Sequence, residues 1–133
     1  MANEATLIYE LELPIPFTCA DGSGIEKGTL VKLTDPMTVA AATADNDVVI
    51  GITAEEKITS DGKTKVGVYL RGVFKMLVGA AGCTVGLPVA ASAANTIVDG
   101  AAADNDAGRI IGRALETGTV GETVLVLVGA GGA

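Results

Sequence analysis

Carboxylates are the side chains of this sequence with the most chemical potential, and Glu10 and Glu12 form the first pair. They alternate along an extended segment, so both would lie on one face of a strand. Glycoside hydrolysis needs two carboxyl groups that face each other across the scissile bond, normally beside aromatic platforms. The chain has two Tyr, two Phe and no Trp. Acid–base catalysis by this pair is therefore disfavoured.

Two Asp-Asn-Asp clusters, at residues 45–47 and 104–106, have the alternating carboxylates found in calcium loops. Such loops need further oxygen ligands, and neither Glu55, Glu56 nor Glu116 follows at the required spacing. Asp and Asn also favour plain turns, because their side chains bond to their own backbone. We interpret both clusters as turns, and cation binding stays open.

Histidine is absent, which removes the commonest general base and a common metal ligand. Cys19 and Cys83 cannot form a zinc site by themselves, and their pairing cannot be deduced from sequence. Two small buried thiols are the favoured interpretation. The sequence thus implies no catalytic residue, no metal site and no cofactor.

Lys75, in Phe74-Lys75-Met76, resembles the modified lysine of biotin- and lipoyl-bearing domains. Those domains are also small, acidic barrels with an internal repeat. Their motif is Ala-Met-Lys-Met in a tight turn, however, and Val73 and Phe74 precede the lysine here. A lysine within a strand is the favoured interpretation.

The charge balance excludes several partners. Nine basic and sixteen acidic residues give a net charge of −7, which argues against nucleic acid and against an anionic membrane. The uncharged stretch between Lys75 and Asp99 is broken by Gly79, Gly86 and Pro88, so it does not predict a membrane span. The N-terminus lacks the basic start of a secretion signal. We expect a soluble protein whose function lies in its surface.

Short runs rich in Val, Thr and Ile, interrupted by Gly or Asp-Gly roughly every 8–12 residues, predict an all-β fold. The predicted strands span residues 29–34, 37–42, 48–53, 55–59, 65–71, 73–78, 87–92, 96–98, 109–115 and 123–128. Ser60-Asp61-Gly62-Lys63 would close a hairpin between the fourth and fifth of these. Residues 124–128 lack polar alternation, which predicts a strand covered on both faces.

An internal repeat organises the chain. Gly28–Val31 matches Gly86–Val89, Ile50-Gly51 matches Ile111-Gly112, and the two acidic turns match each other. The pattern predicts two similar β-units around a shared core, in a small single-domain antiparallel β-barrel or β-tulip with few free edges. We assign this barrel to residues 17–128 and a flexible tail to residues 129–133.

Residues 1–16 are predicted to form an extended N-terminal arm or edge strand. Leu7, Tyr9, Leu11 and Leu13 alternate with polar neighbours and would share one face. Prolines at positions 14 and 16 exclude a central strand. Such an arm would be disordered alone and would become ordered on a partner.

The order of these segments resembles the capsid decoration, or cement, proteins of tailed bacteriophages, over roughly residues 17–128. The motifs that carry the resemblance are Gly28–Val31, Ile50–Thr53, Gly67–Phe74, Gly86–Val89, Ile110–Ala114 and the final Val124–Val128. The resemblance implies a non-enzymatic structural subunit of the virion, on the outer capsid surface. It implies a homotrimer at local threefold positions that binds the major capsid protein and stabilises the expanded shell.

Within this hypothesis the arm binds the capsid by adding a strand to a partner's sheet edge. The residues predicted to make this contact are Leu7, Ile8, Tyr9, Leu11, Leu13, Pro14 and Pro16. Two other functions stay open. One is a biotinyl- or lipoyl-like carrier domain, and the other is a structural protein of a phage tail or of head completion.

Overall fold

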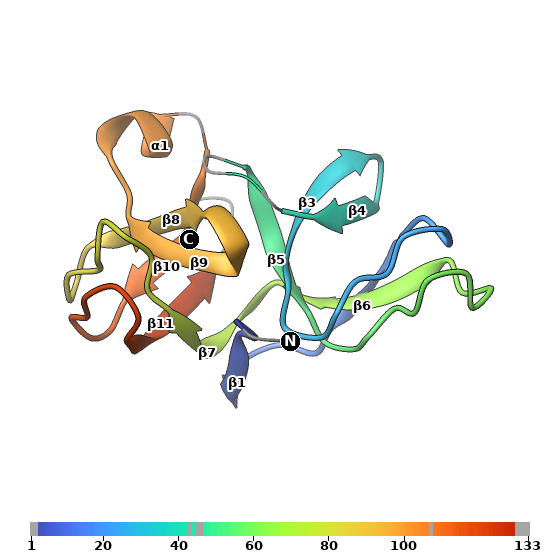
Figure 1. Ribbon diagram of the computed structural model, residues 1–133, viewed down its shortest axis with the longest axis horizontal. Coiled ribbons are helices and arrows are strands. Elements are labelled where there is room, and N and C mark those ends of the chain that lie inside the picture. Colours follow the sequence, from blue (N-terminus) through green and yellow to red (C-terminus); the bar gives the residue numbers. More distant parts are fainter. Residues whose placement is uncertain (1–2, 43, 45–46, 107, 130–133) are drawn as a thin grey trace.

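A computed structural model (Figure 1) describes residues 3–42, 44, 47–106 and 108–129. Its strands are β1 (Thr6–Glu10), β2 (Ile15–Thr18), β3 (Leu30–Asp35), β4 (Thr38–Ala41), β5 (Val49–Thr53), β6 (Lys65–Tyr69), β7 (Arg71–Leu77), β8 (Pro88–Ser92), β9 (Thr96–Asp99), β10 (Ile110–Ala114) and β11 (Thr123–Gly129). A single 3₁₀ turn, Ala93–Asn95, and the five-residue helix α1, Ala102–Asp106, complete the described part. The predicted all-β, single-domain fold is confirmed.

The strands form two groups that lie side by side along the long axis of the molecule (Figure 1). Strands β2, β4, β3, β5 and β6 make a closed barrel, and the order β1-β7-β11-β10-β8-β9 makes a six-stranded sheet. We call residues 15–69 the first unit and residues 71–129 the second unit. Each contains one copy of the predicted repeat.

The repeat is confirmed at the level of register. Val31 of β3 pairs with Gly51 of β5, and Val89 of β8 pairs with Gly112 of β10. The backbone hydrogen bonds agree as well: Gly28 N donates to Thr53 O at 3.0 Å, and Gly86 N donates to Ala114 O at 2.8 Å. The five strands of the first unit therefore correspond in order to five strands of the second: β2 to β7, β3 to β8, β4 to β9, β5 to β10 and β6 to β11.

The two cores are built from matching positions. The pairs of buried side chains, first unit then second, are Phe17/Met76, Cys19/Val78, Ile25/Cys83, Val31/Val89, Val39/Ile97, Val66/Val124 and Val68/Val126. These side chains are all apolar or thiol-bearing, so burial drives the folding of both units in the same way. Large aromatics contribute little, as the composition predicts.

The two units differ in closure. In the first unit β2 meets β4 in parallel at Thr18 and Thr38, whereas in the second unit the same junction is an isolated parallel bridge between Val78 and Ile97. Side chains of β3 and β5 in the first unit cover the core of the second. Leu30 and Ile52 are fully buried in the same cluster as Phe74. The core of the second unit thus extends across the junction into the first unit, while the interior of the barrel forms a separate cluster.

The N-terminal segment is part of this fold. β1 pairs antiparallel with β7 as an edge strand of the sheet, and β2 lies within the barrel between β6 and β4. The boundary predicted between residues 16 and 17 falls inside β2. The expected disorder of the free arm is not what the structure describes, because Ala5 is buried and Leu7 packs against the core.

Pro16 fits a barrel strand for a local reason. Cys19 N donates to Thr64 O beside β6, and Thr18 N donates to Met37 O on the opposite side of β2. Backbone groups of successive residues point to opposite edges of a strand. Pro14 and Pro16 therefore face the edge away from β6, where β2 meets β4 only at Thr18. The missing N–H groups break no ladder bond there.

Three other expectations need correction. Residues 55–59 form no strand, only a bridge between Ile25 and Lys57, so the predicted hairpin does not form, although the chain turns at residues 59–60 and bends at residues 61–62. β11 is not covered on both faces, because Leu127 is 38 % exposed. Gly129, assigned to the flexible tail, is the last residue of β11, and residues 130–133 lie outside the described part.

Candidate docking surface

A β-bulge decides where the predicted arm residues point. Leu7 pairs with Phe74, Tyr9 pairs with Val73, and Ile8 is the extra residue between them. Adjacent residues of β7 face opposite sides of the sheet, so Leu7 and Tyr9 lie on opposite faces. The single apolar face predicted for Leu7, Tyr9, Leu11 and Leu13 is wrong at this point, because one inserted residue exchanges the faces.

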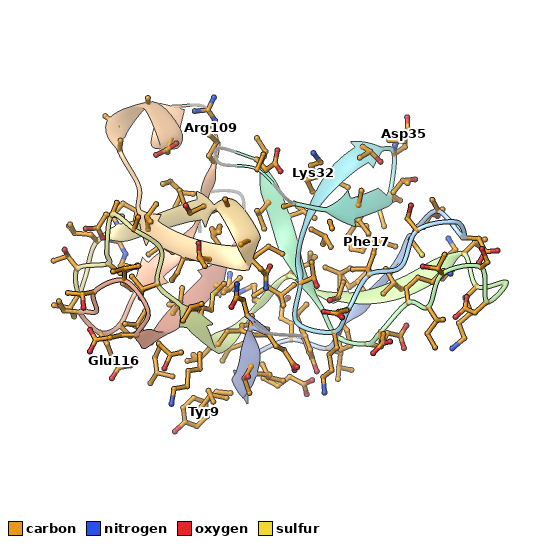
Figure 2. The ribbon with its side chains drawn as sticks, in the orientation of Figure 1. Tyr9, Phe17, Lys32, Asp35, Arg109 and Glu116 are labelled. Carbon is orange, nitrogen blue, oxygen red and sulfur yellow. The ribbon has the colours of Figure 1, made fainter. Side chains whose placement is uncertain are left out.

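The result is a row of exposed apolar side chains that follows the N-terminal segment. We call it the apolar ridge, and its members with their exposed fractions are Ile8 (41 %), Tyr9 (64 %), Leu11 (51 %), Leu13 (75 %) and Ile15 (40 %). Figure 2 shows Tyr9 pointing away from the body of the molecule, whereas Phe17 points into the barrel. Pro14 is half-buried and Pro16 is exposed. Five exposed apolar side chains within eight residues make this segment a candidate interaction site.

Glu10 and Glu12 do not act as a pair. Burial raises the pKa of the Tyr69 hydroxyl, and a hydrogen bond to Glu10 raises it further. Glu12 lies 3.8 Å from Nε of Arg71, with both side chains more than half exposed. Each carboxylate thus has its own partner, and the two do not face each other across a cleft.

In the described part of the two acidic turns, aspartate side chains accept hydrogen bonds from nearby backbone N–H groups. Asp47 accepts a hydrogen bond from Ala44 N at 3.1 Å, and Asp104 accepts one from Ala101 N at 2.9 Å. Residues 45 and 46, and the side chains of residues 105 and 106, lie outside the described part. Within the described ranges, no group of three or more His, Cys, Asp or Glu residues is arranged to hold a metal ion.

Glu55 and Glu116 occupy the same position of the repeat. Glu55 Oε1 accepts a hydrogen bond from Gly67 N at 3.0 Å, and Glu116 Oε1 accepts one from Leu125 N at 2.8 Å. Each carboxylate satisfies the backbone of the last strand of its unit. Glutamates weighed as calcium ligands are therefore structural residues of the repeat.

Both cysteines are buried and free. Cys19 belongs to the core of the first unit and Cys83 to that of the second. Burial raises the pKa of the Cys83 thiol to about 11, with a smaller contribution from Asp99. Thiolate chemistry is disfavoured in such surroundings. The interpretation as two small buried thiols is confirmed.

Lys57 is the site that sequence reasoning missed. Its side chain is 1 % exposed, and its ammonium donates to Asp61 Oδ1 at 2.7 Å and to Asp21 Oδ1 at 2.9 Å. It also donates to the carbonyl oxygen of Ile58 at 2.6 Å. Burial opposes the charge, but the hydrogen bonds to Asp61 and Asp21 outweigh it and raise the pKa of Lys57. This fully paired lysine ties together the loops that contain Asp21 and Asp61.

Lys75, the lysine of the carrier alternative, lies in the middle of β7. It pairs with Thr6 of β1 and with Leu125 of β11. A carrier lysine is presented by a tight turn, so this position does not favour that alternative. The described part of the chain has no helix long and apolar enough to cross a membrane.

Comparison with known proteins adds one result to this geometry. No family model matches the sequence, and no curated protein matches it either. Among solved structures, the chain is similar to the head fiber gp8.5 N base of bacteriophage phi29, with a TM-score of 0.57 and 19 % sequence identity. The match covers 86 % of this chain and 92 % of that chain. The likeness establishes a shared fold over nearly the whole length of both.

Proposed function

We propose that this chain is a structural protein of a tailed-phage head, which binds the outer surface of the capsid and stabilises the expanded shell. The major capsid protein is its partner, and the chain acts as a homotrimer at local threefold positions. It is not an enzyme and needs no cofactor. The observation that carries the proposal is the fold shared with a phage head fiber base, over 86 % of this chain and 92 % of that one.

The apolar ridge is the proposed contact with the capsid. Tyr9 and Leu13 are 64 % and 75 % exposed, although both side chains gain by burial. Tyrosine is also enriched at the energetic centres of interfaces. Ile8 and Tyr9 lie in β1, which is already paired with β7, and Ile15 lies in β2 of the barrel. Little of the segment therefore has to become ordered on binding.

Stabilisation of the shell follows from mass action. A ligand that binds the expanded, assembled state and not the free subunits shifts the equilibrium towards that state. In a trimer that contacts several capsid subunits, the second and third contacts form intramolecularly once the first has formed, which strengthens binding to the shell. No covalent or catalytic step is needed.

Co-sedimentation with expanded shells that lack this protein tests the proposal. Full-length chain should bind in a saturable way, near one copy per capsid subunit. A double variant, Leu11→Ser and Leu13→Ser, should lose binding. The matched control is Ile58→Ser and Val120→Ser, which removes side chains of similar exposure (59 % and 64 %) elsewhere on the surface.

The outcomes separate the alternatives. If the full chain does not bind shells, the capsid function fails. If the variant of Leu11 and Leu13 binds like the wild type, the ridge is not the contact. Rings of six or twelve copies in solution, without shell binding, would favour a tail or head-completion protein.

A further inference from the structure

The outer face of the second unit is an open sheet surface with one continuous row of side chains. Tyr9 pairs with Val73, Val73 pairs with Leu127, and Leu127 pairs with Arg113. Directly opposed residues share a face, so the four side chains cross β1, β7, β11 and β10 in line. Together with Leu125, Lys75 and Arg71 on the same strands, they form what we call the outer face.

The same face of the first unit is buried. By the register of the repeat, Leu30, Ile52 and Tyr69 correspond to Pro88, Arg113 and Leu127. Leu30 and Ile52 are fully buried against the second unit, and the ring of Tyr69 meets that of Phe74 at a centroid distance of 5.7 Å. In the first copy of the repeat this face is a packing surface, and in the second copy it has no cover within the described chain.

The sequence of β11 supports the same conclusion. A run of five Val and Leu residues without polar alternation is typical of a strand covered on both faces. Here Val124, Val126 and Val128 are buried, while Leu125 is half-buried and Leu127 is 38 % exposed. The open side of β11 is therefore apolar where a solvent-facing strand would carry polar residues.

The charge of the outer face indicates what covers it. Arg71, Lys75 and Arg113 are three of the nine cations of the chain, which has sixteen acidic residues. One of these acids, Glu12, lies 3.8 Å from Nε of Arg71 in an exposed pair, and a pair of this kind is weak enough to be exchanged for another carboxylate. Arg71 and Arg113 line a hollow of about 170 Å³ together with Leu127 and Gly129. Guanidinium groups bind carboxylates through paired hydrogen bonds. The remaining surface of this same chain is rich in such carboxylates.

We propose that the outer face binds an acidic surface of a second copy of this chain, with a carboxylate in the hollow between Arg71 and Arg113. The contact joins two different surfaces, and repeated contacts of this kind close into a ring when the rotation between copies is a whole fraction of a turn, one third in a trimer. Arg113 is held in place by a hydrogen bond to Gly86 O at 2.8 Å. The inference deepens the homotrimer of the proposed function, because it names the surface through which the copies meet.

Sedimentation velocity of the full chain over a concentration series tests this. The wild type should self-associate, and Leu127→Glu should abolish association. Arg71→Glu with Arg113→Glu should weaken association by at least about tenfold, the effect of a change near 1.4 kcal/mol. Lys63→Glu, a charge reversal on an exposed loop of the first unit, is the matched control and should associate like the wild type.

Circular dichroism and urea unfolding confirm that each variant is folded before its association is judged. A wild type that stays monomeric at all concentrations overturns the proposal, and so does association that Leu127→Glu and the arginine pair leave unchanged. Shell binding is measured on the same variants. If the arginine pair weakens shell binding but not self-association, the partner is the capsid and the second-copy proposal fails while the proposed function stands.

Discussion

The side-chain amide of Asn95 accepts a hydrogen bond from the backbone N–H of Leu30 at 2.8 Å, across the junction of the two units. Its Nδ2 donates to Gly28 O at 3.0 Å and to Asn3 O at 2.8 Å. One buried side chain in the turn between β8 and β9 thus holds β3 and the segment before β1 together. Its φ of 62° is a conformation that Asn tolerates better than most residues.

Replacing Asn95 should uncouple this junction. Asn95→Ala leaves the buried N–H of Leu30 and the carbonyl group of Asn3 without the amide, whereas Gly28 O still accepts from Ala5 N. It also places Ala at positive φ. We expect a loss of about 3 kcal/mol in the free energy of unfolding, measured by urea titration. Asn95→Gly relieves the backbone strain but not the lost bonds. A glycine variant as stable as the wild type would show that the amide contributes nothing.

The Lys57 cluster predicts a loss of stability in acid. Hydrogen bonds from Lys57 hold the pKa values of Asp21 and Asp61 below their usual value of 3.8. A carboxyl group whose pKa is lower in the folded state stabilises the fold above its unfolded pKa. That contribution is lost as the pH falls through the folded pKa, so stability should decline below about pH 4. The raised pKa of Lys57 places its own loss above pH 10.5.

Lys57→Met isolates this effect. Without the ammonium group, Asp21 and Asp61 keep pKa values closer to those of the unfolded chain, and the dependence of stability on acid pH should flatten. Urea unfolding between pH 2 and pH 6 measures the slope. Lys65→Met, which removes an exposed lysine bonded to Thr18, should retain the wild-type slope. An unchanged slope in Lys57→Met would contradict the assignment.

Gly51 and Gly112 should be intolerant of any side chain. A Cβ atom at Gly51 would collide with the carbonyl oxygen of Tyr69, and one at Gly112 with that of Leu127. Both obstacles are backbone atoms that a rotamer change cannot move. We expect Gly112→Ala and Gly51→Ala to cost about 3 kcal/mol each in thermal or urea unfolding. Gly22→Ala, which meets nothing within 4 Å, should be close to neutral.

Pro14 and Pro16 should protect the open edge of β2. By the repeat they correspond to Val73 and Lys75, the residues of β7 that pair with β1. Pro14→Val and Pro16→Lys give these positions the residues found in the second unit. The change adds two N–H donors to the edge of β2, which then offers a site for another strand. We expect this variant to form larger species than the wild type does at equal concentration. Sedimentation velocity measures the difference. Pro36→Ala, in the turn after β3, should leave the size distribution unchanged.

The sequence predicted the parts of the fold that depend on local chemistry. Gly28 and Gly86, with φ of +80° and +84°, mark equivalent turns that were visible as a repeated motif. The alternation of apolar and polar residues located most of the strands. β2 is not among the predicted strands, because prolines disfavour a strand with two neighbours. They are tolerated here because Pro14 and Pro16 face the edge of β2 away from β6, where β2 meets β4 only at Thr18.

The candidate surface was predicted less well. A bulge at Ile8 has no sequence signature, yet it moves Tyr9 to the opposite face from Leu7. The burial of Lys57 depends on Asp21, which lies in another loop, and on Asp61, which lies four residues further along the same loop. Such features arise from packing between distant segments, so no local pattern contains them.

The pairing of Thr6 with Lys75 and of Glu10 with Gly72 has a consequence for the order of synthesis. β1 leaves the ribosome first, but its partner strand is made only after the whole first unit. The closed barrel needs β2 to β6 alone, so its strands are all available before β7 exists. During translation the apolar strand β1 has no partner until β7 is made, and the sheet of the second unit combines a strand from before the barrel with strands from after it.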